Sequence, residues 1–343
     1  MNINILQYSH EAGPLRKYIE FIRSFYSDVY DPKLIEYYTK NVLRLLSDNN
    51  PFFKYAKIKN FLAWENKNVL GHISAIIDER LKKENIGILG FYDCVQNLSI
   101  SNELLTRAID YLKDSGCKKI IGPINLSIWH GYRFIDKMER SPTIFDPFNK
   151  PYYIDFWQRH GFKISERYVS AVRENFDYVI TPTKEMHDLN IKRGFRIRSL
   201  DPKRLHSDLR IIHELSNKIF DQNKNFIRLS FDEFEYLYKD TLNKLEPSFV
   251  QIMENEEHIP AGFAFCLPNP FIPGQIILKT LGVLKEYRRQ GIAATLIYSL
   301  HRKAKEEGFK EFYYPLIREA SAVTKFSFKG YKLITHYVSL ELK

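Results

Sequence analysis

The stretch GVLKEYRRQGIAATLIYSL, residues 282–300, carries the clearest structural signal in the sequence. It indicates a buried strand that ends in a short polar turn, followed by a helix that starts at Gly291. Such a turn directs successive backbone N–H groups, and the positive end of the helix dipole, toward one point. Gly291 and Ala293 keep side-chain bulk away from that point, and Arg288 and Arg289 add positive charge. The pattern predicts a site for a diphosphate.

The sequence also contains an internal repeat. Residues 161–171 (GFKISERYVSA) and 330–340 (GYKLITHYVSL) share five identities at an offset of 169 residues. Residues 116–124 (GCKKIIGPI) and 308–317 (GFKEFYYPLI) align at an offset of 192, and VLGHISAI aligns more loosely with PAGFAFCL at 191. Because the three matches follow one another in the same order, we interpret the chain as two copies of one fold.

The repeat sets the expected domain organisation. A chain of 343 residues is long enough for two domains of about 170 residues. The offset falls from 192 to 169 along the repeat, so the first copy carries 23 additional residues, placed at 125–150. We predict domains at 1–175 and 190–343, joined near residues 172–193.

Hydrophobic periodicity indicates the same order of elements, β-α-α-β-β-β-α-β-α-β, in both copies. In the first copy the predicted segments are 2–8, 12–27, 32–47, 60–66, 68–77, 86–94, 102–115, 118–122, 151–160 and 163–171. In the second copy they are 195–200, 208–220, 231–245, 248–254, 261–267, 275–284, 291–307, 311–317, 320–329 and 333–342. Strands that follow one another imply an antiparallel part, and the later alternation implies parallel strands joined by helices. The predicted fold class is therefore α/β, with a mixed α+β sheet.

Composition excludes several classes of protein. The net charge of +10 is divided equally between residues 1–175 and the remainder, without a basic tail, so nucleic acid is not expected as a partner. The three cysteines are scattered and form no CxxC, which excludes a disulfide framework and a zinc ribbon. No apolar run approaches the ~20 residues of a membrane span, and the first ten residues lack a signal-peptide pattern. We therefore expect a cytoplasmic protein with no membrane partner and no metal.

With Arg288, Gly291 and Ala293, the turn matches the pattern Arg/Gln-x-x-Gly-x-Gly/Ala and resembles the GCN5-related N-acetyltransferase (GNAT) superfamily. The segment SAVTKFSFKGYK at 321–332 is similar to the closing helix and Gly-Phe/Tyr turn of that family. The resemblance covers residues 195–343 well and reaches the first copy through the repeat and the element order. It implies two tandem GNAT-like (acyl-CoA N-acyltransferase) domains. The corresponding turn of the first copy, VQNLSISNELL, has no glycine, so we predict that this copy is degenerate and does not bind CoA by this route.

The resemblance also implies a co-substrate and the residues that hold it. Acetyl-CoA would bind through its pyrophosphate at the turn and beside the preceding strand. The implied contacts are Leu281, Val283, Arg288, Arg289, Gln290, Gly291, Ile292, Ala293 and Phe326. A backbone N–H near Leu281–Val283 is implied to polarise the thioester carbonyl.

The tyrosine that often protonates the departing thiolate in this family is missing. It should lie four residues before the Gly-Phe/Tyr pair, where this chain has Phe326, which has no proton to donate. We select Tyr314 as its replacement. The alternatives are Tyr313, Ser321, Tyr298 and water. Glu319 takes the position of a family asparagine, and it either binds the acceptor amine or starts a helix as a first-turn acid.

The insertion and the strand beside it supply candidates for the acceptor site. GPINLSIWHGYRF and FNKPYY combine Asn, Ser, Trp, His and Tyr with Gly and Pro, a composition common in loops that line ligand sites. The predicted acceptor residues are Asp93, Asn125, Ser127, Trp129, Tyr152 and Tyr153. The alternative is that the aromatic residues pack in the core and that Asn125 forms a turn. His130 and His160 have no partner Ser or Cys in the pattern and are predicted to be noncatalytic.

These features lead to one main function and two alternatives. The main prediction is an acyl-CoA-dependent N-acyltransferase that transfers an acetyl group from acetyl-CoA to a small-molecule or peptide amine. The first alternative is a tRNA-dependent aminoacyl transferase, since peptidoglycan-bridge enzymes are also tandem GNAT folds. The second is a non-catalytic acyl-CoA-binding module, which the missing tyrosine would suit. The oligomeric state stays open, with a homodimer as one option.

Overall fold

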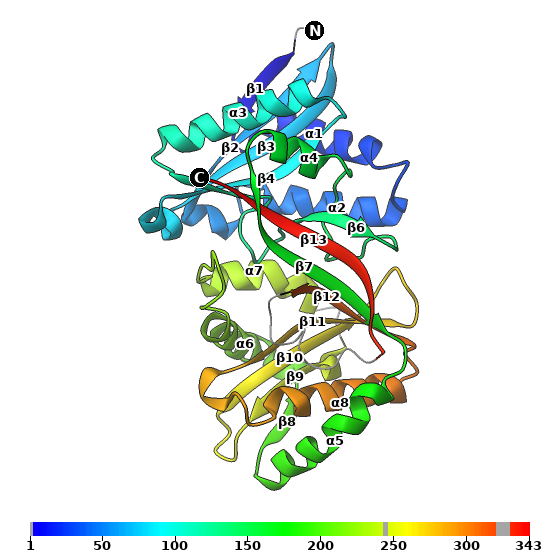
Figure 1. Cartoon of the computed structure of the whole chain (residues 1–343). Helices are drawn as coiled ribbons and strands as arrows, with labels where there is room; N and C mark the ends of the chain where they lie inside the picture. Colours follow the sequence, from blue (N-terminus) through cyan, green and yellow to red (C-terminus); the bar gives the residue numbers. More distant parts are fainter. Residues whose placement is uncertain (1–2, 243–245, 320–329) are drawn as a thin grey trace. The chain divides into compact units, whose positions relative to one another are not determined.

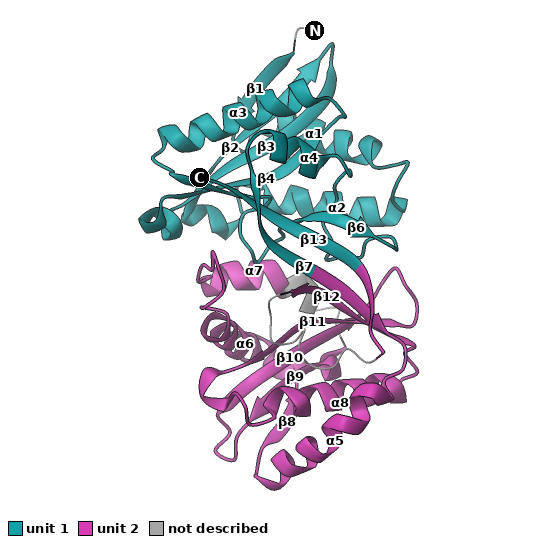
Figure 2. Ribbon diagram, viewed as in Figure 1, with its two compact units in different colours: residues 1–168, 335–343 teal, residues 169–334 magenta. Residues whose placement is uncertain are grey.

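The computed structural model (Figure 1) describes residues 3–242, 246–319 and 330–343 of the chain. These residues form two compact units, which Figure 2 shows in different colours. Unit 1 comprises Met1–Tyr168 and Thr335–Lys343, and unit 2 comprises Val169–Ile334.

Unit 1 is built on a sheet with the strand order β1-β2-β3-β4-β5-β13. Its strands are β1 (Asn4–Tyr8), β2 (Ala56–Glu65), β3 (Asn68–Asp78), β4 (Ile86–Cys94), β5 (Lys119–Gly122), β6 (Phe134–Met138) and most of β13 (Lys332–Leu342). Neighbours in the sheet are antiparallel except β4 and β5, which are parallel, and β6 pairs with β13. The sheet is therefore mixed, as the order of elements predicts.

Helices cover both faces of the unit 1 sheet (Figure 1). They are α1 (Ala12–Phe25), α2 (Pro32–Leu45), α3 (Leu98–Asp114) and α4 (Tyr153–Arg159). α1 buries Leu15, Ile19 and Ile22, whose spacing of three to four residues places them on one side of the helix. α3 packs on the opposite face of β2 and β3 from α1.

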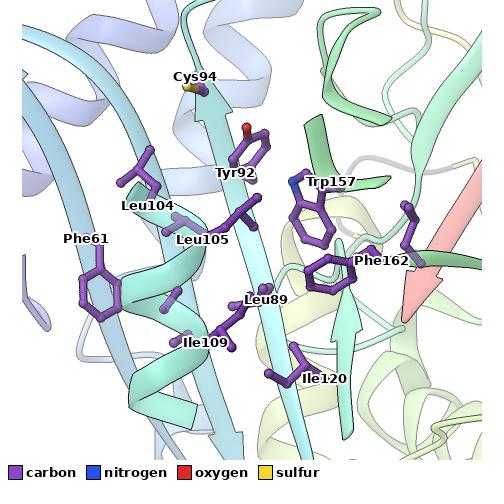
Figure 3. Packing of buried hydrophobic residues seen from close by; sticks show 14 of the residues in the cluster. Phe61, Leu89, Tyr92, Cys94, Leu104, Leu105, Ile109, Ile120, Trp157 and Phe162 are labelled. Carbon is purple, nitrogen blue, oxygen red and sulfur yellow. The ribbon is translucent and has the colours of Figure 1, made fainter. Parts of the chain in front are cut away.

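A hydrophobic core lies between α3 and the unit 1 sheet (Figure 3). α3 contributes Leu104, Leu105 and Ile109, β4 contributes Leu89, and α4 adds Trp157; all five are buried. Burial of each large aliphatic side chain contributes about 1.5–3 kcal/mol. This packing fixes the position of β4, which carries Asp93, one of the residues predicted to face the acceptor.

Unit 2 repeats the architecture with the strand order β7-β12-β11-β10-β9-β8. Its strands are β8 (Arg196–Ser199), β9 (Val250–Glu254), β10 (Pro260–Pro268), β11 (Gln275–Val283), β12 (Glu311–Arg318) and the end of β7 (Lys163–Arg173). β8, β9, β10 and β11 pair with one another in antiparallel order, and β11 and β12 are parallel. The helices are α5 (Asp177–Lys192), α6 (Leu205–Ile219), α7 (Phe231–Leu242) and α8 (Ile292–Glu306).

α8 is the helix predicted from the stretch at residues 282–300. It buries Ile292, Leu296 and Leu300 against the sheet of unit 2, and α5 packs along its outer side. α6 lies on the other face, where Ile219 approaches Gly282 of β11. β11 is therefore held between two helices at the centre of its sheet.

The two units exchange their last strands. Residues Thr335–Lys343, which include most of β13, belong to unit 1, whereas the end of β7 from Val169 onward belongs to unit 2. The predicted domain ranges, 1–175 and 190–343, contain no such exchange. A repeat shows the order of elements along the chain, but not which sheet a terminal strand joins.

The element order predicted from the sequence is confirmed for the described residues. Two elements were not predicted. β6 lies in the insertion, and α5 forms from the segment that the sequence predicts as a connection between the two copies. The helix predicted at 320–329 lies outside the described residues. Among the helices that the structure describes, none has the length and apolar character needed to cross a membrane.

Candidate cofactor site

β11 and β12 separate in the middle of the unit 2 sheet. Their pairing joins Gln275–Ile277 to Glu311–Tyr313 and extends no further among the described residues. From Leu278 onward, every residue of β11 except Gly282 is partly exposed, although β11 is a central strand. Among the residues that the structure describes, the second half of β11 therefore lacks the parallel neighbour that a central strand normally has. A strand edge of this kind can hydrogen bond to the amide groups of an extended ligand.

A β-bulge accompanies this separation. Thr280 of β11 lies opposite Phe265 and Leu278 lies opposite Cys266, so Lys279 is one additional residue on β11. A bulge bends its strand and increases the local twist. Lys279 lies two residues after Ile277, the last residue of β11 that pairs with β12, so the bulge lies where β11 departs from its parallel neighbour.

The turn after β11 ends in a helix N-terminus that has no side-chain cap. A short 3-10 turn at Lys285–Tyr287 leads to Gly291, which precedes α8. The first bond of the helix runs from the Thr295 N–H to the Gly291 carbonyl, at 2.9 Å. The three N–H groups before Thr295 therefore have no intrahelical acceptor, and the first turn contains no acidic residue. This end of α8 favours an anion.

Gly291 is required by its conformation and by its neighbours. Its φ angle is +77°, in the left-handed region that favours glycine, and a Cβ atom would lie 2.1 Å from Cγ of Met186 in α5. The sequence predicts a glycine here so that an anion can approach the backbone. In the structure, the packing against α5 and the backbone conformation also require it. Arg289 also has a positive φ, of +64°. Left-handed residues in such a turn direct neighbouring N–H groups to one side.

The side-chain amide of Asn190, a buried residue of α5, holds the turn in place. Nδ2 of Asn190 donates to the Gln290 carbonyl at 3.1 Å and to Oγ1 of Thr295 at 2.9 Å. The last residue before Gly291 is thus tied to the first turn of α8. Asn190 was missed by the sequence analysis, because no local pattern in α5 marks the residue that contacts a turn 100 positions away.

The described residues implied for acetyl-CoA lie together on β11, the turn and α8. Leu281 and Val283 are partly exposed on the second half of β11, and Ala293 is partly exposed in the first turn of α8. Ile292 is buried in the core beneath that turn, so its backbone N–H alone can contact a ligand. Phe326 lies outside the described residues.

The polar side chains of the turn are exposed. Nε of Arg288 donates to the Val283 carbonyl at 3.3 Å, and Nη2 donates to the Ile219 carbonyl at 3.4 Å, which lays the guanidinium across the end of β11. Gln290 donates to the Glu286 carbonyl at 2.9 Å. Arg288 and Arg289 therefore add two positive charges to the helix N-terminus without an acidic neighbour in the first turn of α8.

Tyr314 lies directly after the last paired residue of β12, where the two strands begin to separate. It is buried, and its hydroxyl lies 2.6 Å from Nε2 of His301 in α8. Nδ1 of His301 lies 2.7 Å from the Ile297 carbonyl, which only accepts, so Nδ1 is the donor. Burial lowers the pKa of His301 to about 3 and raises that of Tyr314. Nε2 of neutral His301 therefore accepts a hydrogen bond from the Tyr314 hydroxyl.

The other proposed proton donors are spread over the unit. Tyr313 is fully buried, and Tyr298 is buried with its ring stacked on His187 at 4.4 Å. Ser321 lies outside the described residues. Glu319, which is predicted to bind the acceptor amine or to start a helix, is exposed in the turn after β12. None of these placements tests a catalytic role, which stays a prediction for Tyr314 and for Glu319.

The equivalent strand of unit 1 is β4, which is buried along the part that corresponds to the partly exposed half of β11. Gly71 pairs with Cys94 and Gly262 pairs with Val283, so the repeat makes Cys94 the counterpart of Val283. β4 also parts from β5 after Ile88, yet all nine residues of β4 are buried. Side chains and backbone of unit 1 take the place of a bound ligand along this edge.

Four hydrogen bonds close the edge of β4. The Leu89 carbonyl accepts from the Ile124 N–H at 2.8 Å, and the Phe91 N–H donates to Oδ1 of Asn125 at 2.7 Å. The Cys94 N–H donates to the Tyr153 hydroxyl at 2.9 Å, and the Tyr152 hydroxyl donates to the Cys94 carbonyl at 2.8 Å. Three residues predicted to face the acceptor, Asn125, Tyr152 and Tyr153, therefore bond to the backbone of β4.

The helix after β4 is closed as well. Oδ1 of Asn97 accepts from the N–H groups of Ser99 and Ile100, at 3.0 and 3.3 Å, and so caps α3. The corresponding residue of unit 2 is Gly291, which offers no side chain. This difference supports the expectation that the first copy does not bind CoA by this route.

Asp93 lies in a buried cluster of tyrosines at the end of β4. Its carboxylate accepts hydrogen bonds from Tyr18 at 2.7 Å, from Tyr26 at 2.5 Å and from Tyr153 at 3.3 Å. Burial raises the pKa of Asp93 to about 6, although the three hydroxyls oppose that rise by stabilising the anion. Tyr18 also stacks on His72 at 3.7 Å. The structure thus brings Asp93 and Tyr153 together, and their role toward an acceptor stays a prediction.

Ser127 and Trp129 form a separate turn with His130. Oγ of Ser127 accepts from the Trp129 N–H at 3.3 Å and lies 2.8 Å from Nδ1 of His130. The statement that His130 has no partner serine is therefore wrong, because Ser127 reaches it within one turn of chain. The His130 ring packs edge-on against Phe52, and burial lowers its pKa to about 3. The noncatalytic role of His130 stays a prediction.

Comparison with known sequences gives one family and two similar proteins. Residues 211–318 match the acetyltransferase (GNAT) family. The protein YghO of Escherichia coli (strain K12) is 25% identical over 261 residues, which cover 74% of this chain and 66% of that protein. A bacterial ceramide synthase of Caulobacter vibrioides (strain NA1000 / CB15N) is 25% identical over 236 residues, which cover 66% of this chain and 60% of that protein. The chain thus spans less than two thirds of the length of either relative.

Comparison with solved structures supports the fold over the whole chain. A tandem GNAT protein from the clavulanic acid biosynthesis pathway superposes with a TM-score of 0.61. The superposition covers 99% of this chain and 98% of that protein, at 8% sequence identity. At this identity the similarity concerns the fold alone.

Proposed function

The chain belongs to the GNAT superfamily, with its family match in the second half, and on this premise we propose that it is an acyl-CoA-dependent N-acyltransferase. One observation carries the proposal. In unit 2 the uncovered half of β11 adjoins an uncapped helix N-terminus, whereas unit 1 closes both features with its own side chains. Within the described ranges, unit 2 alone thus offers a strand edge and an anion site in the order that an acylated pantetheine and its phosphates require.

The residues of unit 2 divide the binding between them. Acyl-CoA supplies the activated thioester. The N–H groups at the start of α8, together with Arg288 and Arg289, would hold the pyrophosphate. The edge of β11 around Leu281–Val283 would hold the pantetheine amides and donate one N–H to the thioester carbonyl.

Proton transfer accompanies the attack of the amine. The amine must be neutral to attack the carbonyl, and the departing thiolate must gain a proton. We keep Tyr314 as the proposed donor because it lies where β11 and β12 separate. Its proton is held by His301, so transfer to a thiolate would require the hydroxyl to turn away from the histidine.

The proposed acyl group and acceptor rest on the similarity to known proteins. Acetyl-CoA is the donor that the GNAT match suggests, with a small-molecule or peptide amine as acceptor. The likeness to a bacterial ceramide synthase favours a second candidate, because a ceramide is the N-acyl amide of a long-chain amino alcohol. We therefore propose long-chain acyl-CoA with an amphiphilic amine as the alternative pair of substrates.

An acylation assay tests the proposal. The protein is incubated with acetyl-CoA or palmitoyl-CoA and a panel of amines that includes polyamines, amino sugars, peptides and sphinganine, and free CoA thiol and the amide product are measured. We expect CoA release that depends on one class of amine, with an N-acyl product of the matching mass. Release that is independent of every amine, with no amide formed, would contradict a transferase.

A further inference from the structure

Three segments of unit 2 surround the N-terminus of α8. The end of α5 reaches the turn through the bond from Asn190 to Gln290. The β9–β10 turn, residues 255–259, reaches it through Nδ2 of Asn255, which donates to the Tyr287 hydroxyl at 3.3 Å. Phe195, which leads into β8, packs edge-on against the Tyr287 ring at 6.1 Å. We call the exposed surface of these three segments and of the turn 284–290 the loop face.

The loop face is basic. Its exposed cations come from the end of α5, the start of β8 and the turn before α8. They are Lys192, Arg193, Arg196, Lys285, Arg288 and Arg289. Its exposed acids are Glu256, Glu257 and Glu286, so six positive charges meet three negative ones. The corresponding turn of unit 1, Val95–Asn97, carries no charge.

Large apolar side chains are exposed on the same face. Leu189 and Ile191, on either side of Asn190 in α5, are 38% and 44% exposed, and Ile259 in the β9–β10 turn is 48% exposed. A nucleotide needs a few phosphate contacts and one flat apolar surface. Basic side chains that continue beyond the turn onto α5 and β8, with apolar residues among them, resemble a protein interface, where charge guides association and apolar contacts stabilise it.

We propose that the loop face docks an acidic carrier protein whose phosphopantetheine arm delivers the acyl group to unit 2. The inference rests on the proposed function and names the donor of that same site. A phosphopantetheine arm shares with CoA the pantetheine amides and a phosphate, so the edge of β11 and the start of α8 suit both. The arm would run from the start of α8 along the edge of β11, and the segments of the loop face contact the turn that leads into α8.

The step is an acyl transfer that balances without a further reactant. The amine nitrogen forms a bond to the thioester carbonyl carbon, and the bond from that carbon to the pantetheine sulfur breaks. The carrier leaves with a thiol, which gains the proton that the amine loses. No oxidant or reductant takes part.

A binding comparison with matched variants tests the inference. The full-length protein is titrated with a purified acidic acyl carrier protein that bears phosphopantetheine, with acetyl-CoA, and with vesicles that contain anionic phospholipid. The test variant is Arg193→Glu/Arg196→Glu, on exposed side chains outside the turn. The control is Lys203→Glu, which reverses an exposed charge beyond the other end of β8.

The expected result is specific to the carrier. The double variant should bind the carrier at least tenfold more weakly and acetyl-CoA within twofold of the parent, whereas Lys203→Glu should change neither. Carrier affinity should also fall as salt is added. Unchanged acetyl-CoA binding shows in the same experiment that the variant is folded.

Three results would overturn the inference. The first is no saturable carrier binding by a parent that binds acetyl-CoA, which would leave the proposed function standing. The second is binding of anionic vesicles but not of the carrier, which would assign the loop face to a membrane surface. The third is an equal loss of acetyl-CoA and carrier affinity in the double variant, which would assign Arg193 and Arg196 to the nucleotide. A parent that binds neither donor would refute the proposed function as well.

Discussion

Replacement of Ala293 by glutamate is expected to weaken acetyl-CoA binding at least a hundredfold, a loss of about 2.7 kcal/mol. Ala293 is partly exposed in the first turn of α8, so a longer side chain fits there. Its carboxylate would lie beside the N–H groups that we assign to the pyrophosphate, and would both occupy them and repel the phosphates. Calorimetric titration with acetyl-CoA measures the loss.

The fold should tolerate this change, because an acid in the first helical turn interacts favourably with the helix dipole, by about 0.3–1 kcal/mol. Ala293→Gln is the matched control, since glutamine has the same shape without the charge. We expect the glutamine variant to retain most of the affinity. If glutamate and glutamine weaken binding equally, bulk rather than charge is responsible, and the anion site at α8 loses its support.

The stability of unit 1 is expected to respond to pH through Asp93. Its pKa is about 6 in the folded chain, because it is buried, against an ordinary value of 3.8. The folded state therefore holds the proton more tightly than the unfolded state does. The stabilisation from this proton is complete below pH 3.8 and is lost as the pH rises through 6.

The expected size of this effect is about 2 kcal/mol between pH 4 and pH 7. Asp93→Asn removes the titration and keeps the shape of the side chain, so we compare the two proteins. Urea denaturation measures the free energy of unfolding of each protein. The value for the parent minus the value for the variant should fall by this amount as the pH rises from 4 to 7. Parallel curves for the two proteins would show that Asp93 does not titrate in this range.

Much of the fold could be predicted from the sequence, because the signals are local. The strand and helix of residues 282–300 follow from periodicity and from a turn rich in polar residues, and they occur as β11 and α8. The repeat supplied the rest of the order, since each segment of one copy supports its counterpart in the other. The strand exchange could not be predicted, because the segments that include β7 and β13 share the same pattern of residues, which does not show which sheet each strand joins.

Only the part of the candidate site that is local in sequence could be predicted. Arg288, Gly291 and Ala293 are close in sequence, so their joint position at the start of α8 follows from one turn of helix. Asn190 and Met186 approach that turn from α5, and Tyr18 and Tyr26 approach Asp93 from α1 and its end. Contacts between such distant segments arise from packing, which a single sequence does not reveal.

The degenerate first copy illustrates how a binding site can be closed. Its turn lacks the glycine, as the sequence shows, but the closure itself depends on Asn97, Asn125, Tyr152 and Tyr153. These side chains bond to the strand edge and helix N-terminus whose counterparts in unit 2 no described side chain covers in the same way. Loss of a motif and gain of internal hydrogen bonds are therefore two aspects of one change.

The most direct test of this account is the number of acetyl-CoA molecules that one chain binds. Calorimetric titration of the full-length protein should give one saturable site per chain, because unit 1 fills its own strand edge and unit 2 does not. The single site should disappear in Ala293→Glu. Two equivalent sites per chain, or no site in a protein that is shown to be folded, would contradict the account.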